Sequence, residues 1–271
     1  MSAPLRLAVL GDPLDFTLSP VLHRAGLEAL GLAGESEALR VPASRLGAAL
    51  ERLAAAGFRG VNLTHPLKRA ALAHALHPSD SARRALSVNT LGFEPDGTWG
   101  ETTDGAGFLA LLGELGVPVA GARVVLFGAG GAARSLALAL LGAGATEVSA
   151  WARRPGEASA AWEAIPGATM TGWESDAARA ALAAADVVVN ATPLDGADGP
   201  CAPAGLPRRA QVVDLVYGPE LTPWVRATRA AGIAAVDGLG LLVHQARRSL
   251  ALWTGREAPL APLARAVGWP R

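Results

Sequence analysis

The chain has 271 residues, of which 51% are hydrophobic and 18% charged, and its 24 basic side chains balance 24 acidic ones. This length allows one large domain or two small ones with a substantial core. A formal net charge of zero, with no block of basic residues, argues against nucleic acid as the main partner. Because Cys201 is the only cysteine, there is no disulfide framework and no cysteine metal cluster, which favours a reducing compartment such as the cytoplasm.

Two apolar stretches bear on membrane binding. The run from Met1 to Leu10 is interrupted by Arg6 and ends at Gly11, so it is too short for a signal peptide. The longest apolar run, residues 136–145, is about half the length of a membrane span. We therefore expect no membrane partner.

The N-terminal part of the chain alternates predicted strands and helices. Residues 5–10 have a strand pattern, and Ser19 followed by Pro20 predicts a helix, because serine is a good N-cap and proline suits the first helical position. The elements that follow are a strand at 37–41, a helix at 44–56, a strand at 60–63 and a helix opening at Pro66. This alternation predicts a parallel α/β sheet with ligands at the carboxyl ends of its strands, where 11–19 and 62–68 lie.

The next segment contains short strands and one helix. Strand patterns occupy residues 86–89, 91–94 and 99–101. Thr102-Thr103-Asp104-Gly105 then precedes a predicted helix over 106–115, and glycine and proline at 116–118 end that helix. This region is where we expect the chain to pass from one domain to another.

A glycine-rich turn opens the second half. Residues 123–127 have the pattern of a buried strand and run directly into Gly128-Ala129-Gly130-Gly131-Ala132-Ala133-Arg134, which begins a predicted helix. The turn has the G-x-G-x-x-A spacing in the strand–turn–helix setting that dinucleotide binding requires. Its glycines permit a tight turn and let a pyrophosphate approach the helix N-terminus.

The following strand, 147–152, ends in Arg153 and Arg154. An NAD site usually places an acidic residue there to hold the ribose hydroxyls, whereas arginines suit the 2′-phosphate of NADP. We therefore expect NADP, with two solvated surface arginines as the alternative. The remaining elements are helices at 157–165 and 176–184, strands at 186–190 and 211–216, a helix at 219–231, a strand at 233–236 and a final helix at 241–253.

Scarce residue types single out candidate site positions. Lys68 is the only lysine, although the chain has 24 basic residues, so arginine serves at every other basic position. Lysine can transfer its proton when its pKa is lowered and arginine cannot, which suggests a chemical role for Lys68 against the alternative of a surface accident. The other scarce polar residues are Asn62, Asn89, Asn190, Gln211, Gln245 and Tyr217.

Nine stretches, in order along the chain, resemble those of the shikimate dehydrogenase family. They are GDPLDFTLSPVLH (11–23), GVNLTHPLK (60–68), SVNT (87–90), TDG (103–105), GAGGAAR (128–134), ARR (152–154), NATP (190–193), DLVYGPELTP (214–223) and DGLGLLVHQA (237–246). The resemblance implies reversible, NADPH-dependent reduction of 3-dehydroshikimate to shikimate in aromatic amino acid biosynthesis. It also implies an α/β substrate-binding domain, residues 1–103 and 240–271, and a Rossmann dinucleotide-binding domain, residues 104–239.

The resemblance also assigns roles to particular residues. Lys68 and Asp104 match the catalytic pair. The substrate-binding positions are Thr17, Ser19, Thr64, Lys68, Asn89, Asp104, Tyr217 and Gln245. The cofactor-binding positions are Gly128, Ala129, Gly130, Gly131, Ala132, Arg153, Arg154, Thr192, Leu215 and Gly238. Asp80 stands where some members have a cofactor-contacting acid, whereas Asn62 and Asn190 are expected to stabilise turns.

Two rival functions stay open at this point. One is a quinate/shikimate dehydrogenase that uses NAD, which Arg153 and Arg154 disfavour. The other is a catalytically silent regulatory protein on the same fold, which would be expected to lose Lys68 or Asp104. The five histidines are expected to be structural, no pair of them has metal-ligand spacing, and we expect no metal. A homodimer is one candidate assembly, and the sequence does not decide the oligomeric state.

Overall fold

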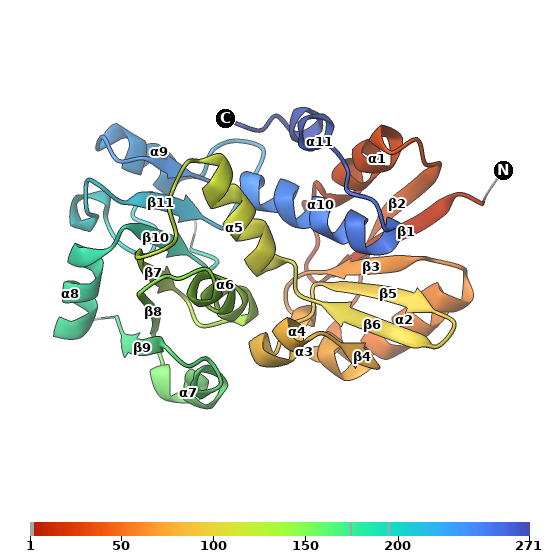
Figure 1. Ribbon diagram of the computed structural model, residues 1–271, viewed down its shortest axis with the longest axis horizontal. Coiled ribbons are helices and arrows are strands. Elements are labelled where there is room, and N and C mark those ends of the chain that lie inside the picture. The colour runs from red at the N-terminus through yellow and green to blue at the C-terminus, as the bar shows by residue number, and fades with distance from the viewer. Residues whose placement is uncertain (1–2, 174, 195) are drawn as a thin grey trace. The chain divides into compact units, whose positions relative to one another are not determined.

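The computed structural model describes residues 3–173, 175–194 and 196–271. They form two compact units: residues up to Gly107 with Leu242–Pro270, and Phe108–Leu241 with Arg271. The chain passes from one unit to the other within helices α5 (Asp104–Glu114) and α10 (Leu239–Thr254), both visible in Figure 1. The residue-level boundaries expected at 103/104 and 239/240 stay a prediction.

The first unit is built on a mixed sheet. Among the described residues its strands run in the order β2-β1-β3-β5-β6-β4, with β1, β2 and β3 parallel and β5 antiparallel to both β3 and β6. The strands are β1 (Leu5–Gly11), β2 (Gly34–Arg40), β3 (Gly60–Leu63), β4 (His77–Pro78), β5 (Thr90–Glu94) and β6 (Gly97–Glu101). The helices are α1 (Ser19–Ala29), α2 (Leu46–Ala55), α3 (Leu67–Ala70), α4 (Asp80–Ala85) and α11 (Leu260–Val267), with 3-10 turns at Ala43–Arg45 and Ala71–His74.

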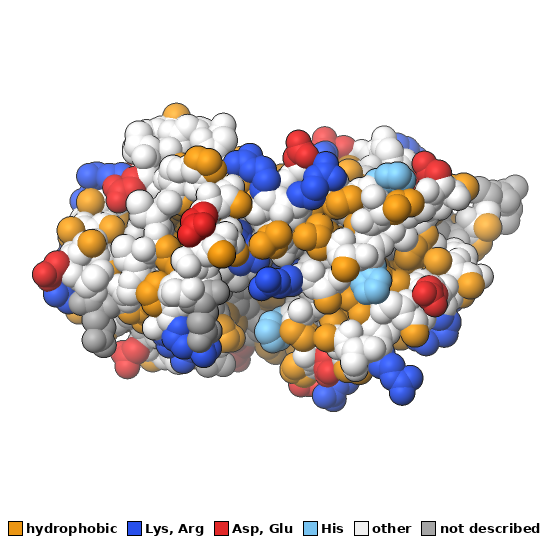
Figure 2. Space-filling view, turned by 90° about the horizontal axis from the view of Figure 1, so that it is seen from below, with side chains coloured by type: hydrophobic (Ala, Val, Ile, Leu, Met, Phe, Trp, Pro, Cys, Tyr) orange, Lys and Arg blue, Asp and Glu red, His pale blue; other side chains and the backbone are white. Residues whose placement is uncertain are grey.

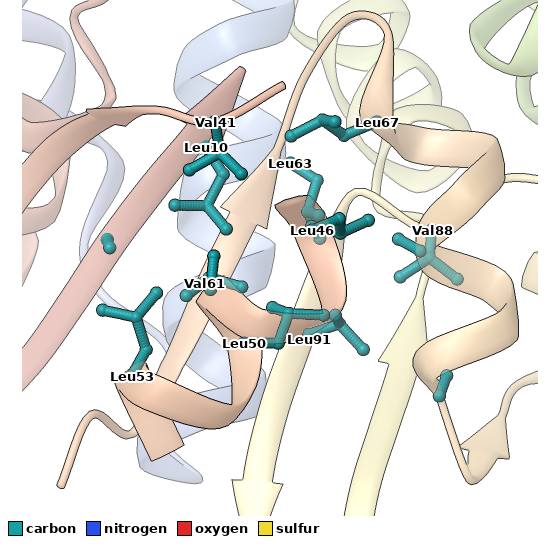
Figure 3. Close-up of a cluster of buried hydrophobic side chains, with 14 of the residues drawn as sticks. Leu10, Val41, Leu46, Leu50, Leu53, Val61, Leu63, Leu67, Val88 and Leu91 are labelled. Atoms are coloured by element: carbon teal, nitrogen blue, oxygen red, sulfur yellow. The ribbon is translucent and has the colours of Figure 1, made fainter. Parts of the chain in front are cut away.

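One face of this sheet packs against α2 and α3. Because side chains alternate along a strand, Leu10 of β1 and Val61 and Leu63 of β3 point to the same side. They form a buried cluster with Leu50 of α2 and Leu67 of α3 (Figure 3). This core supports the strand-to-helix turn between β3 and α3.

The opposite face is covered by α1 and α10. A Cβ added at Gly26 of α1 would lie 2.3 Å from a methyl carbon of Leu250, and one at Gly60 of β3 would lie 2.2 Å from the indole nitrogen of Trp253. Both glycines therefore permit close packing against α10 that any larger residue would disturb. The Trp253 indole also donates a hydrogen bond of 2.9 Å to the Leu91 carbonyl. Helix α10, from the C-terminal part of the chain, is thus packed on the N-terminal sheet.

The second unit has a parallel sheet in the order β12-β11-β10-β7-β8-β9 among the described residues. Its strands are β7 (Arg123–Phe127), β8 (Glu147–Ala152), β9 (Ala168–Gly172), β10 (Val187–Asn190), β11 (Gln211–Asp214) and β12 (Ala235–Val236). Its further helices are α6 (Gly131–Gly142), α7 (Pro155–Glu163), α8 (Asp176–Ala184) and α9 (Pro223–Ala230), with a 3-10 turn at Pro203–Gly205. Counted from β7, this is the 3-2-1-4-5-6 order of a Rossmann fold, as predicted.

Several local details differ from the expectation. Leu18 is the N-cap of α1 and Ser19 is its first residue, so Ser19 does not cap the helix. Residues 87–89 are not a strand, because α4 ends in a left-handed residue at Leu86 and the chain must turn before β5 begins. The short strands β4 and β9 were not expected.

Charges are mixed on the surface. In Figure 2, basic and acidic side chains are interspersed with apolar ones over the face in view, in keeping with the zero formal net charge. None of the helices in the described part of the chain has both the length and the apolar character of a transmembrane span.

Candidate active site

Lys68 lies at the carboxyl end of a parallel strand in the first unit. β3 ends at Leu63 and α3 begins at Leu67, which makes Lys68 the second residue of that helix. The turn is held to its neighbours through backbone hydrogen bonds: Thr64 donates to the Leu10 carbonyl at 2.9 Å, and Val88 donates to the Lys68 carbonyl at 2.8 Å. The lysine backbone is therefore fixed by the sheet.

Lys68 and Asp104 form an ion pair. The Lys68 Nζ donates to Asp104 Oδ2 at 2.6 Å, and the two side chains are 23% and 5% exposed. Asp104 is the first residue of α5, which brings a carboxylate to a helix N-terminus, where negative charge is favoured. The pair leaves the ammonium partly open to solvent and the carboxylate almost entirely enclosed.

Asn89 orients the second oxygen of Asp104. Its Nδ2 lies 2.9 Å from Asp104 Oδ1, 3.0 Å from Thr103 Oγ1 and 2.9 Å from Gln245 Oε1. Its own Oδ1 accepts from the backbone N–H of Thr103 at 2.8 Å. Asn89 is 1% exposed, so its amide serves as the fixed centre that connects Lys68, Asp104 and Gln245.

Gln245 reaches this cluster from α10. Position 107, on the facing helix α5, has no side chain: a Cβ at Gly107 would lie 2.9 Å from the Gln245 backbone nitrogen. The close contact of the two helices there brings Gln245 within hydrogen-bonding distance of Asn89. The predicted substrate-binding residues Lys68, Asn89, Asp104 and Gln245 are thus adjacent.

A second buried network lies behind the first. Asn62 Nδ2 is 2.9 Å from the Asn89 carbonyl, 3.0 Å from Thr90 Oγ1 and 3.1 Å from Ser249 Oγ. Its Oδ1 faces His23 Nε2 at 2.9 Å. Asn62 was expected to stabilise a turn, but it lies within β3 and connects that strand to α10 and α1.

His23 is completely enclosed, which determines its protonation. Since Asn62 presents an oxygen to Nε2, the neutral imidazole donates there, and Nδ1 accepts from the hydroxyl of Ser36 at 2.8 Å. Burial lowers the pKa of His23 from 6.5 to about 4; the hydrogen bond to Asn62 opposes this shift and the charge of Arg24 adds to it. His23 is therefore neutral at pH 7 and stays a structural residue, as expected.

Three hydroxyl groups lie at the ends of the parallel strands. Thr17 and Ser19 precede and open α1, and their hydroxyl oxygens are 3.4 Å apart. Thr64 follows β3, and a Cβ at Gly11 would lie only 2.6 Å from its methyl group, so Gly11 allows Thr64 to approach β1. Thr17 and Thr64 are half-buried, and Ser19 is 5% exposed.

The glycine-rich turn lies at the switch point of the Rossmann sheet, between β7 and β10. Gly128 has φ of +113°, and a Cβ there would lie 2.7 Å from the Ala191 carbonyl oxygen. Gly130 is the N-cap of α6, and a Cβ there would meet no atom within 4 Å. The first glycine is thus required by the fold, and the second keeps the helix N-terminus open.

The Ala129 carbonyl anchors this turn. It accepts from Arg134 Nη1 at 2.9 Å and from the Trp162 indole at 3.2 Å. Arg153 and Arg154 follow β8 and are both exposed at the start of α7. The structure therefore places the two predicted 2′-phosphate residues at the strand end next to the glycine-rich turn.

The other predicted cofactor residues follow β10, β11 and β12. Thr192 donates from its backbone N–H to Asn190 Oδ1 at 3.0 Å. Leu215 donates to the Asn190 carbonyl at 2.8 Å, and a Cβ at Gly238 would lie 2.2 Å from the Leu215 carbonyl oxygen. Asn190 therefore connects the loops after β10 and β11, a wider role than the turn stabilisation expected of it.

Sequence reasoning missed the importance of Asp214. This fully buried carboxylate accepts from Asn190 Nδ2 at 2.8 Å and from the Thr222 hydroxyl at 2.7 Å. Burial raises its pKa from 3.8 to about 6, despite these hydrogen bonds, and the nearby charge of Asp237 adds to the rise. An aspartate between the apolar pairs Val212-Val213 and Leu215-Val216 was the signal available in the sequence.

The two remaining predicted residues lie apart from these clusters. Tyr217 is half-buried in the segment after β11. Asp80 is 89% exposed and pairs with Arg83, three residues further along α4, at 2.8 Å. Among the described residues, no group of three or more histidine, cysteine, aspartate or glutamate side chains is arranged to hold a metal ion.

A Rossmann sheet with an open glycine-rich turn is typical of dinucleotide-dependent oxidoreductases, and the first unit adds a lysine–carboxylate ion pair. Profiles of known families extend this result. The Shikimate dehydrogenase substrate binding domain matches residues 9–91, and the Shikimate 5'-dehydrogenase C-terminal domain matches residues 238–267.

Whole-chain relatives agree. A shikimate dehydrogenase (NADP(+)) of Acidiphilium cryptum is 44% identical over 260 residues, covering 94% of this chain and 92% of the relative. The crystal structure of shikimate 5-dehydrogenase from Thermus thermophilus in complex with NADP(H) and shikimate has a TM-score of 0.87 at 37% identity, covering 97% of this chain and 98% of that one. The chain therefore belongs to the shikimate dehydrogenase family.

One further solved structure shows that the fold is shared with another enzyme. The ligand-free 5-ketofructose reductase of Gluconobacter sp. strain CHM43 has a TM-score of 0.85 at 28% identity, covering 98% of each chain. Identity to the shikimate dehydrogenases above is higher, at 44% and 37%. The fold alone therefore does not specify the substrate.

The buried His23 predicts a pH dependence of stability. Its pKa is lowered to about 4 in the folded chain, so between about pH 6.5 and pH 4 only the unfolded chain gains this proton. His23 should therefore contribute a fall of about 3 kcal/mol in the free energy of unfolding as pH drops through this range, while Asp214, with its raised pKa of about 6, acts in the opposite direction. Urea unfolding at several pH values measures it.

His23→Gln is the informative variant, because a glutamine amide can still donate to Asn62 without titrating. The difference in the free energy of unfolding between this variant and the unchanged chain isolates His23, because Asp214 is present in both, and it should change by about 3 kcal/mol in favour of the variant as pH drops from 6.5 to 4. The matched control is His77→Gln, which replaces an exposed histidine. If the free energies of unfolding of the two proteins change in parallel between pH 6.5 and 4, the account of His23 is wrong.

Proposed function

We propose that this protein is a shikimate dehydrogenase that interconverts 3-dehydroshikimate and shikimate with NADPH and NADP. The observation that carries the proposal is the contact of 2.6 Å between Lys68 Nζ and Asp104 Oδ2, with Asn89 holding the other carboxylate oxygen. Membership of the family supports the same activity and cofactor. The reaction is a step in the synthesis of aromatic amino acids.

The Lys68–Asp104 pair supplies the proton that the reaction needs. Reduction of the ketone adds a hydride to the carbonyl carbon and a proton to its oxygen, and the reverse reaction removes both. A group beside the reacting oxygen must give and take that proton. Lys68 is partly open to solvent and can contact this oxygen, while Asp104 holds the ammonium in place. The two side chains act together in this proton transfer.

The first unit offers matching partners for the rest of the substrate. Shikimate carries one carboxylate and three ring hydroxyls. The hydroxyls of Thr17 and Ser19 at the N-terminus of α1 suit the carboxylate, since both the hydrogen bonds and the helix dipole favour negative charge there. The Asn89 and Gln245 amides and the Thr64 hydroxyl suit the ring hydroxyls. Tyr217 is assigned to substrate by family resemblance alone.

The second unit has the features that NADP requires. Gly130 leaves open space before α6, so the N–H groups of Gly131 and Ala132 can receive a pyrophosphate. Exposed Arg153 and Arg154 can pair with the 2′-phosphate. The bound nicotinamide supplies or accepts the hydride. Further proposed contacts come from Gly128, Ala129, Thr192, Leu215 and Gly238.

Two broader parts of the proposal concern location and assembly. We propose a cytoplasmic location, which a metabolic role and the single cysteine, Cys201, support. A homodimer is proposed as the assembly, and light scattering after size-exclusion chromatography measures it. The partners proposed for the site are small molecules.

The central test is turnover by the purified full chain. NADP reduction followed at increasing shikimate should saturate, and NAD in place of NADP should lower kcat/KM. Quinate and the reduced product of 5-ketofructose serve as comparison substrates, because a fold shared with a ketofructose reductase makes them the relevant alternatives. Failure to oxidise shikimate, or a clear preference for either comparison substrate, would falsify the proposed function.

Lys68→Arg tests the role of the ammonium. Arginine keeps the positive charge beside Asp104 but is a poor proton donor with a different shape. We expect kcat to fall by about 10²–10⁴-fold, the usual contribution of general acid–base catalysis, with a smaller change in the KM for shikimate. Arg69→Lys is the matched control, since it makes the converse change at the neighbouring residue. Near-normal turnover of Lys68→Arg would mean that the lysine supplies charge alone.

Arg153 and Arg154 predict the preference for NADP. Replacing both with alanine should weaken NADP much more than NAD, because charge-assisted contacts of about 1.5–3 kcal/mol each would be lost only with the 2′-phosphate. The KM values for both cofactors, measured at saturating shikimate, give the comparison. Arg179→Ala, at another exposed arginine of the same unit, is the control. Equal increases in the KM values for NADP and NAD would show that the arginines do not bind the 2′-phosphate.

A further inference from the structure

Arg271 makes an unusual set of contacts in the second unit. Its guanidinium donates to the backbone carbonyls of Gly218, Pro219 and Glu220, at 2.9, 2.9 and 3.1 Å. Nε and Nη2 also donate to Asp237 Oδ2, at 3.1 and 2.5 Å. One side chain therefore holds three consecutive carbonyls and a carboxylate.

Asp237 explains why a cation is needed at this place. Its side chain is completely buried and directly precedes Gly238, and its Oδ1 accepts from the backbone N–H of Leu239 at 3.2 Å. A buried carboxylate is costly unless a charge and hydrogen bonds compensate it. Arg271, only 19% exposed, supplies that charge. Asp237 in turn fixes the direction in which the guanidinium fork points.

The carbonyls that Arg271 holds belong to the segment carrying Tyr217. Before Tyr217, the chain is fixed by the bond of 3.1 Å from the Val216 N–H to Asp214 and by the bond of 3.0 Å from the Gly238 N–H to the Val216 carbonyl. Residues 218–222, all of them described, form neither helix nor strand before α9 begins. Residues 218–220 are half-buried or exposed, so packing contributes little there. The hydrogen bonds from Arg271 to the carbonyls hold this segment instead.

We propose that Arg271 is a positioning residue for Tyr217, and thereby for binding of the substrate. Arginine suits this task because its planar fork presents five donors in fixed directions, whereas lysine presents a compact point charge. Loss of Arg271 frees the carbonyls of residues 218–220 and lets Tyr217 occupy several positions. The inference rests on the proposed function, in which Tyr217 contacts shikimate.

Tyr217 itself provides a readout that does not depend on activity. It is the only tyrosine in the chain, so incorporating 3-fluorotyrosine gives a protein with a single ¹⁹F resonance from this site. The resonance is recorded for the unchanged chain, for Arg271→Ala and for Arg271→Lys. Arg226→Ala is the matched control, because it removes an exposed ion pair of 3.2 Å to the Glu220 side chain of the same segment. Thermal unfolding is measured for all four proteins.

Arg271→Lys separates positioning from charge compensation. It keeps a cation beside Asp237 and should preserve most of the thermal stability, yet it cannot hold three carbonyls at once. We expect a shifted or broadened ¹⁹F resonance in both Arg271 variants and an unchanged one in Arg226→Ala. The KM for shikimate should rise by roughly 5- to 20-fold in Arg271→Lys, while kcat and the KM for NADP change by less than about twofold.

Two results would overturn the inference. An unaltered ¹⁹F resonance in Arg271→Lys means that Arg271 does not position Tyr217. An altered resonance with an unchanged KM for shikimate means that this position does not matter for binding. If the unchanged chain does not oxidise shikimate, the proposed function fails, while the ¹⁹F comparison still decides whether Arg271 holds the segment.

Discussion

The enclosure of Asp104 is the constraint on which the first unit's site depends. A carboxylate that is 5% exposed has lost most of its hydration, so both oxygens need partners from the protein. Lys68 contacts one oxygen and Asn89 the other. Each partner must itself be held in place, which the β3–α3 turn does for Lys68 and the contacts with Thr103 and Gln245 do for Asn89.

The residues that hold Asp104 need hydrogen-bond partners of their own within the first unit. Asn89 is held by its carbonyl as well as by its side chain, and the carbonyl accepts from Asn62. Asn62 is oriented by His23, which burial keeps neutral at pH 7. A buried polar network of this kind is stable only when every member is satisfied. It joins β3, β5, α1 and α10, so the helix that carries Gln245 is held against the sheet by polar contacts as well as by Trp253.

The second unit also contains buried carboxylates that are held by hydrogen bonds, and these fix loops after its strands. Asp214 and Asp237 are both completely buried. Asp214 accepts from Asn190 at the end of β10 and from the Val216 N–H in the loop after β11, and Asp237 accepts from the N–H of Leu239, which opens α10. Asp214 is compensated by neutral donors, which leaves its pKa raised to about 6, whereas Asp237 has the charge of Arg271. Carboxylates thus fix the loops that bear the proposed cofactor residues and Tyr217. Rigid loops of this kind reduce the entropy lost when ligands bind.

Much of the candidate site could be predicted because several of its residues form short motifs or belong to residue types that are rare in this chain. The glycine-rich turn follows a buried strand and opens a helix, so its position and its dinucleotide function can be read from adjacent residues. Lys68 stands out because arginine occupies every other basic position. The strand–helix alternation indicated the fold class, and the structure confirms the Rossmann order of β7 to β12. These features depend on neighbours in sequence, where spacing and propensity act directly.

Other features depended on contacts between distant residues, which sequence spacing does not encode. Ser19 has the chemistry of an N-cap, but the chain entering α1 places Leu18 there. Asn62 has the local pattern of a turn residue, yet its partners come from β5, α1 and α10. The pairing of Arg271 with Asp237 joins residues 34 positions apart, and only the packed unit brings them together. The sequence by itself indicated most of the strands, the glycine-rich turn and the lysine proposed to act in catalysis, because short-range sterics and chemistry govern them. Tertiary structure alone decided which partners the buried carboxylates and amides have, because enclosure from water makes those partners necessary.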